Sequence, residues 1–128
     1  MRICISSKGK SLDSEIDPCF GRSLYFIIID PDSLEFEAIE NPYNKAAGGS
    51  GIDSALFVAK QEIKVLLTEH CGPNAFHTLQ AAGIEVFLRA SGTVKETLER
   101  YKNGEFEETP SPDVIQDYGM PEKTDSED

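Results

Sequence analysis

Cysteine is scarce in this chain, and its few cysteines are not arranged as a cofactor motif. The 128 residues include Cys4, Cys19 and Cys71, and no two of them form a C-x-x-C pair. An odd number of cysteines disfavours a disulfide framework. The missing C-x-x-C excludes a zinc or iron–sulfur motif formed by a single segment. The thiols are therefore left as packing residues, or as ligands that only the fold brings together.

Basic residues are also few, and this argues against nucleic acid as a partner. The chain has 12 lysines and arginines against 23 acids, which gives a net charge of −11. A protein that binds DNA or RNA obtains most of its affinity from a basic patch. Nine of the acids follow Gly104, however, where Lys123 is the single base. The region before Gly104 is only mildly acidic, so a small anionic ligand is still compatible with the charge.

Long apolar runs are missing as well. None approaches the ~20 residues that a membrane-spanning helix needs. The first residues, M-R-I-C-I-S, have the pattern of a strand rather than of a secretory signal. We therefore expect a cytoplasmic protein that does not enter a membrane.

Signatures of catalysis are absent from the sequence pattern. No Ser-His-Asp or Cys-His-Asn arrangement is recognisable, and the first expected strand, R-I-C-I-S, has no acid where a two-magnesium nuclease needs one. A hydrolase that uses Asp13 or Asp17 is the least favoured hypothesis. We expect a protein that is not an enzyme.

Hydrophobic periodicity predicts an α/β protein with the element order β-β-β-α-β-α-β-α. Strands are expected at 2–6, 24–29, 36–39, 65–67 and 84–88, and helices at 52–59, 73–82 and 94–102. Three strands without helices between them form an antiparallel meander, and the later units cross over to run parallel. The simplest result is a three-layer α/β/α fold around a five-stranded mixed sheet of order 3-2-1-4-5, a ribonuclease H-like topology. Residues 1–104 are the expected domain, and 105–128 an acidic, loosely structured tail.

Local sequence patterns indicate where two of the helices begin and which face of another helix is buried. Pro73 is suited to the first position of a helix, and Thr93 to Glu96 has the pattern of a capping box. In the first helix, Ile52, Ala55, Leu56 and Ala59 stand at helical spacing.

The candidate ligands lie in two loops that the predicted topology places on one edge of the sheet. The loop from Ser7 to Arg22 follows the first strand, and the loop from Glu69 to Pro73 follows the fourth, which is its parallel neighbour. Both loops then lie at the carboxyl ends of strands, where open α/β sheets bind ligands. Cys19 could approach His70 and Cys71, and together they make a soft ligand set suited to zinc, copper or an iron–sulfur cluster.

The same residues also have a purely structural interpretation. In that interpretation, which the sequence supports equally well, Cys71 is a small buried residue at a strand end and His70 lies in solvent. Cys4 lies among isoleucines, so packing is its expected role. The glycine-rich loop from Asn44 to Gly51 departs from G-x-G-x-x-G, and its glycines either bind an anion or allow a sharp turn into the next helix.

Six short motifs occur in order and together resemble one known family. They are D-P-C-F-G-R (17–22), Asn41-Pro42, G-G-S-G-I (48–52), G-P-N-A (72–75), A-G-I (82–84) and S-G-T-V (91–94). The sequence resembles the dinitrogenase iron–molybdenum cofactor biosynthesis family, which includes small NifX-like domains and the C-terminal domain of NifB. The resemblance covers residues 1–104 and implies a ribonuclease H-like fold without nuclease activity. Where many relatives have H-F-G-R, this chain has Cys19 in place of the histidine.

The resemblance implies a small carrier or scaffold that binds an iron–sulfur or molybdenum–iron–sulfur cluster, loosely held, during metallocofactor assembly. Cys19, His70 and Cys71 are then the expected metal ligands. Arg22 and the N–H groups near Gly72 and Asn74 are expected to balance the negative charge of the cluster. The alternative is a cofactor-free protein–protein interaction module that acts on a metallocluster-assembly partner through its edge strand or its tail.

Overall fold

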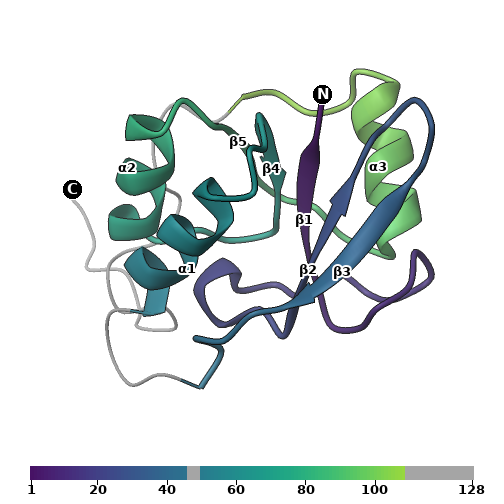
Figure 1. The fold of residues 1–128 in the computed structure, drawn as a ribbon. Coiled ribbons are helices and arrows are strands. Elements are labelled where there is room, and N and C mark those ends of the chain that lie inside the picture. The colour runs from purple at the N-terminus through teal and green to yellow at the C-terminus, as the bar shows by residue number, and fades with distance from the viewer. Residues whose placement is uncertain (46–49, 109–128) are drawn as a thin grey trace, which may run out of the picture.

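The computed structural model describes residues 1–45 and 50–108, which form one five-stranded mixed sheet with helices on both faces (Figure 1). The strand order is β3-β2-β1-β4-β5. β1–β2 and β2–β3 are antiparallel, whereas β1–β4 and β4–β5 are parallel. The three-layer α/β architecture and the order 3-2-1-4-5 predicted from the sequence are confirmed. The strands are β1 (Ile3–Ser7), β2 (Tyr25–Ile29), β3 (Phe36–Glu40), β4 (Val65–Leu67) and β5 (Glu85–Phe87).

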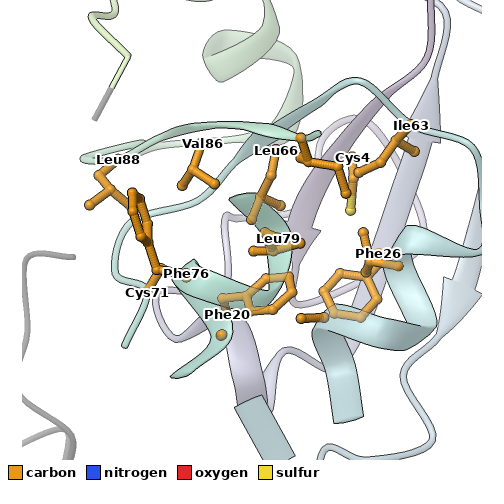
Figure 2. Packing of buried hydrophobic residues seen from close by; sticks show 14 of the residues in the cluster. Cys4, Phe20, Phe26, Ile63, Leu66, Cys71, Phe76, Leu79, Val86 and Leu88 are labelled. Carbon is orange, nitrogen blue, oxygen red and sulfur yellow. The ribbon is translucent and has the colours of Figure 1, made fainter. Parts of the chain in front are cut away.

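The helices divide between the two faces of the sheet. α1 (Ser50–Ala59) and α2 (Pro73–Ala81) cover one face, and α3 (Val94–Lys102) covers the other (Figure 1). Because side chains alternate along a strand, each sheet face has its own apolar core. Cys4 and Leu66 face α1 and α2 in the first core, which Figure 2 shows, and Ile3 and Val65 face α3 in the second. The central strands are buried on both faces, as expected for parallel strands between helical layers.

Cys4 has the packing role expected from its neighbours in the sequence. Its side chain is fully buried in the first core (Figure 2). Burial in an apolar environment disfavours the thiolate and raises the pKa of the Cys4 thiol far above its ordinary value. A thiol in this environment is chemically inert.

Local signals set the ends of the helices as predicted. Pro73 is the first residue of α2. At the start of α3, the Thr93 hydroxyl accepts a hydrogen bond from the Glu96 N–H (3.1 Å), and the Glu96 carboxylate accepts one from the Thr93 N–H (2.9 Å). This reciprocal capping box satisfies two N–H groups that the helix itself cannot pair.

The buried face of α1 differs from the one expected. Ser54, Ala55 and Val58 are buried, whereas Ile52 and Leu56 are 39 % and 50 % exposed. Periodicity alone does not decide between two overlapping apolar stripes on one helix. Tertiary contacts set the rotation here: Ala55 and Val58 pack in the first core, and the Ser54 hydroxyl donates a hydrogen bond to the carbonyl of Gly21 (2.9 Å).

The segment between β1 and β2 is more ordered than its polar sequence suggests. Lys8 N–H donates to the Glu15 carbonyl (2.9 Å), Ile16 N–H donates to the Gly92 carbonyl (2.9 Å), and the Ile16 side chain is buried in the second core. These bonds tie the segment to the end of β1 and to the turn before α3. It ends in a single 3-10 turn, η1 (Phe20–Arg22).

Packing continues past residue 104. The ring of Phe106 lies edge-on to Phe87, with 6.4 Å between ring centroids, and the Arg100 guanidinium lies 4.5 Å from the Phe106 ring centre. The domain boundary at 104 stays a prediction. Residues 109–128 of the predicted tail, and Gly48 and Gly49 of the glycine-rich loop, lie outside the described residues. Within residues 1–45 and 50–108, no helix has the length and apolar character needed to cross a membrane.

Candidate functional site

The two loops that carry the candidate ligands meet as the topology predicted. Cys19 and His70 lie opposite each other in a short parallel bridge. The His70 N–H donates to the Pro18 carbonyl (2.9 Å), and the Phe20 N–H donates to the His70 carbonyl (3.1 Å). Fifty-one positions apart in the sequence, these two residues are thus held side by side by main-chain hydrogen bonds.

The bridge also decides which side chains share a face. Residues directly opposite each other in a β-type pair project to the same side, and their successors project to the other side. Cys19 and His70 are both partly exposed, whereas Phe20 and Cys71 are buried in the first core (Figure 2). The pairing therefore brings together a thiol and an imidazole at the protein surface.

Cys71 differs from its predicted place in the ligand set. Its side chain is 1 % exposed and packs in the core that also contains Phe76 and Leu88 (Figure 2). Cys71 is therefore placed as in the structural interpretation of the sequence, as a small buried residue at a strand end. Among the residues that the structure describes, no group of three or more His, Cys, Asp or Glu side chains is arranged to hold a metal ion.

Buried hydroxyl groups fix the strand ends beneath the bridge. Ser6, the residue before the end of β1, and Thr68, just after β4, share a hydrogen bond of 2.7 Å between their hydroxyl oxygens. The Ser6 hydroxyl also lies 2.8 Å from the carbonyl oxygen of Asp17, to which it donates. Both hydroxyls are fully buried, so each bond forms in a medium where an unpaired polar group is costly. Asp17 precedes the bridge by two residues, so this network fixes the start of the Cys19 segment.

A second buried network fixes η1 from the other side. The Asn41 amide donates to the Ser54 hydroxyl (3.1 Å), which donates in turn to the carbonyl of Gly21 (2.9 Å). The Asn41 side-chain oxygen accepts from the Tyr43 N–H (3.0 Å). The end of β3, the middle of α1 and η1 are thereby joined through fully buried side chains of Asn41 and Ser54.

Charges at this edge of the sheet are mixed but favour an anion close to η1 and α2. Arg22 ends η1 and is exposed. Gly72 precedes α2 as its N-cap, and no side chain caps the N–H groups of the first turn, which includes Asn74. Free N–H groups and the helix dipole attract negative charge. Opposing this, Glu69 lies 3.4 Å from the Nε2 atom of His70, whose side chain is 31 % exposed.

Comparison with known proteins identifies the family. The model of the dinitrogenase iron–molybdenum cofactor family matches residues 1–104. The chain belongs to this family. The resemblance inferred from the six sequence motifs is confirmed, and with it a place among proteins related to iron–molybdenum cofactor biosynthesis.

Relatives match most of this chain, and two of them have solved structures with the same fold. The apo form of the orange protein from Desulfovibrio gigas is 35 % identical, with a TM-score of 0.86 over 88 % of this chain and 96 % of that one. A Thermotoga protein provisionally described as NifB is 36 % identical, with a TM-score of 0.74 over 84 % of this chain and 91 % of its own. An uncharacterized protein of Methanocaldococcus jannaschii is 26 % identical over 98 residues, which are 74 % of this chain and 83 % of that protein.

Sequence reasoning missed the residues that support the site. Asn41, Ser54, Ser6 and Thr68 are all fully buried polar residues, and none was singled out as part of the site. A signal was present in one case: Ser54 lies at helical spacing with the apolar Val58 and next to Ala55. A hydroxyl on the inward face of a helix indicates a buried hydrogen-bond partner.

Proposed function

We propose that this protein carries a metal–sulfur cluster, of the iron–sulfur or molybdenum–iron–sulfur type or a precursor of one, as cargo during metallocofactor assembly. The observation that carries the proposal is the pairing of Cys19 with His70 on one face of a bridge at the carboxyl ends of β1 and β4. Thiolate and imidazole are ligands that suit iron, copper and molybdenum–sulfur chemistry better than magnesium or calcium. A site with few ligands suits a cargo that must be released to the next protein.

The surroundings of the pair provide for the negative charge of such a cargo. The guanidinium of Arg22 and the main-chain N–H groups of Gly72 and Asn74 are proposed to balance it, since hydrogen bonds from charged donors and helix N-termini are the usual partners of anions. The buried networks below hold both segments in place, so that little order has to be gained on binding.

Family membership supports a role in cofactor assembly. The Desulfovibrio gigas relative is called the orange protein and was solved in an apo form, and a name and a state of this kind fit a protein that binds a coloured group. We extend this property to the present chain as part of the proposal. The protein is proposed to act as a carrier and not as an enzyme, with metallocluster-assembly proteins as its partners.

The ribonuclease H-like assignment belongs to the same proposal. β1 has the sequence I-C-I-S-S and carries no carboxylate, whereas a two-magnesium nuclease places acids on its central strands. We propose that this protein uses the ribonuclease H-like fold to place the Cys19 and His70 loops at one edge of the sheet. It is not expected to carry out the metal-dependent hydrolysis of nucleases with that fold.

Reconstitution tests the proposal directly. The protein would be purified without oxygen and incubated with ferrous iron and sulfide, with and without molybdate, and its metal, acid-labile sulfide and visible absorption would be measured. Cys19→Ser and His70→Ala are expected to lose most of the bound metal and sulfide. His77→Ala is the matched control, because His77 is exposed on α2 and is not part of the bridge.

The same experiment tests Cys71 as the third predicted ligand. The Cys71 thiol is buried, so Cys71→Ser should lower uptake only if the loop from Glu69 to Pro73 opens and lets the cargo reach it. Loss of uptake with an unchanged melting temperature would show that this loop opens. Equal uptake by the wild type and the Cys19 and His70 variants, or no uptake by any of them, would refute the carrier proposal. The cofactor-free interaction module would then be the better hypothesis.

A further inference from the structure

β3 forms an edge of the sheet with a regular, uninterrupted register. Its five residues pair with β2 from Phe36, opposite Ile29, to Glu40, opposite Tyr25, without a bulge. The other side of β3 has no strand beside it in the part of the chain that the structure describes (Figure 1). β3 contains none of the residues proposed to hold the cargo.

The register shows which main-chain groups point outward. In an antiparallel pair, only every second residue exchanges hydrogen bonds with the neighbouring strand. Asp30 N–H donates to the Glu35 carbonyl (3.0 Å) and Asn41 N–H donates to the Leu24 carbonyl (3.0 Å), which places Glu35 and Asn41 among the residues bonded to β2. By alternation Glu37 and Ile39 are also bonded to β2.

The intervening residues, Phe36, Ala38 and Glu40, therefore direct their N–H and C=O groups away from the sheet. They provide three donors and three acceptors in a row. No hydrogen bond of these groups to another described residue is found outside the β2–β3 ladder.

The usual devices that protect a free edge are only partly present. Natural edges are blunted by proline, lysine, bulges or covering segments, and β3 has the sequence F-E-A-I-E. Apolar surface adjoins the free groups, because Phe36 is 42 % exposed and Leu34, just before the strand, is 46 % exposed. Such an edge is open to an additional strand unless charge prevents it.

The charge at this edge has a single sign. Asp32, Glu35, Glu37 and Glu40 are all exposed, and residues 30–44 contain no lysine or arginine. Ala38 packs towards the second core and Ile39 towards the first. Alternation therefore places Glu40 and Phe36 on the α3 side of the sheet and Glu37 on the α1 and α2 side. An incoming strand meets a carboxylate on each face.

We propose that β3 is a docking edge for an extended strand of a basic partner protein, which adds to the sheet by main-chain hydrogen bonds. Opposite charges across neighbouring strands stabilise the pairing, and like charges destabilise it. The partner strand is expected to present lysine or arginine beside Glu37 and Glu40 and an apolar residue beside Phe36. Binding by strand addition takes its affinity from the main chain and its specificity from such alternating side chains.

A second copy of this chain is disfavoured as the occupant by the same charges. Pairing of two β3 edges brings together two acidic strands from molecules that each carry a net charge of −11. The carboxylates therefore protect the edge against self-association while leaving it open to a strand of the opposite charge.

A capped peptide with lysines at the two positions that face Glu37 and Glu40, and valines at the positions that face Phe36, Ala38 and Ile39, is a suitable probe. Hydrogen exchange of the backbone amides, followed by NMR, should show new protection at Phe36, Ala38 and Glu40 on binding, whereas Glu37 and Ile39 are protected already in the free protein. A peptide in which proline replaces each valine has the same charge but cannot extend the ladder, and it should give no protection.

Two sets of variants separate strand addition from simple charge attraction. Ala38→Pro removes an outward N–H and leaves the β2 ladder intact, so peptide affinity should fall about tenfold. Glu37→Gln with Glu40→Gln should weaken binding several-fold more than the matched pair Glu107→Gln with Glu108→Gln, which removes the same charge elsewhere on the exposed surface.

Three results would overturn the proposal: equal binding of the valine and proline peptides, unchanged exchange at the three outward amides of the wild type, or equal effects of the two glutamine pairs. The exchange measurement uses the unaltered protein, so the proposal stays testable even if the proline variant does not fold. Loss of cargo uptake in the reconstitution experiment has no bearing on any of these outcomes.

Discussion

Replacing Ser54 by alanine should destabilise the protein and weaken cargo uptake together. The Ser54 hydroxyl accepts from the Asn41 amide at 3.1 Å and donates to the Gly21 carbonyl at 2.9 Å. Asn41 is fully buried, so its amide hydrogen is left without a partner in the variant, whereas Gly21 is half-buried and we expect water to replace the lost partner of its carbonyl. Leaving one buried donor unpaired costs about 1–3 kcal/mol.

This loss of unfolding free energy is large enough to measure as a lower melting temperature. For a folded region of this size, each kcal/mol lowers the melting temperature by about 5 °C, and urea unfolding should give a lower midpoint with an unchanged slope. The double variant with Asn41→Ala should cost less than the sum of the two single changes, because both remove the same hydrogen bond.

The matched control is a buried hydroxyl on the opposite helical layer. Thr97 is fully buried in α3 and donates to the Ser91 carbonyl at 3.0 Å. Thr97→Val removes this bond and keeps the shape of the side chain, so it should cost about 1 kcal/mol while cargo uptake per folded molecule stays at the wild-type level. Ser54→Ala should lower uptake, because the Gly21 carbonyl fixes the turn that follows Cys19.

Two results would refute this reasoning. A change in unfolding free energy of less than about 0.5 kcal/mol would place Ser54→Ala among ordinary surface substitutions, which would mean that the network does not stabilise the fold. Equal uptake by the Ser54 and Thr97 variants would mean that the network does not position the site.

Three further predictions concern the α3 side of the protein. Thr93→Ala removes the cap of α3 and should lower the unfolding free energy by about 1 kcal/mol, as measured by urea unfolding. Phe106→Ala should cost about 1–2 kcal/mol, because it loses buried area and the contact with Phe87. A chain that ends at residue 104 should lose as much unfolding free energy as Phe106→Ala. If it is instead as stable as the full chain, the domain boundary at 104 is supported. Burial, followed by the charge of Glu85, raises the pKa of Tyr101. Folding therefore favours the neutral phenol of Tyr101. The stability that Tyr101 contributes is complete below the ordinary tyrosine pKa and is lost as the pH rises through the raised pKa of the folded protein. Phenolate absorbance should show a lower pKa of Tyr101 in Glu85→Gln, and an unchanged value would refute the charge effect.

Much of the fold followed from the sequence because its signals are local. Apolar runs gave the strands around Ile27 and Leu66, the capping pattern gave the start of α3 at Thr93, and Pro73 gave the start of α2. Once the elements were ordered, the handedness of crossovers left few sheet topologies. The meeting of the Cys19 and His70 segments was a consequence of that topology and was predictable for the same reason.

Tertiary structure alone decided the direction of individual side chains. The sequence grouped Cys71 with Cys19 and His70, but the one-residue alternation at the bridge turns Cys71 into the core and leaves the other two outside. The inward face of α1 was likewise settled by tertiary contacts, among them the Ser54 bond to Gly21, because periodicity alone did not choose between its two overlapping apolar stripes.

The sequence by itself determined the layers, the order of the strands and the family, because each rests on patterns within a few neighbouring residues or on motifs in a fixed order. Only the tertiary structure decided which two of the three predicted ligands share a face, and which amides of β3 are left for a partner. Both depend on register, and the side-chain period of two residues means that a shift of one position reverses every inside and outside assignment.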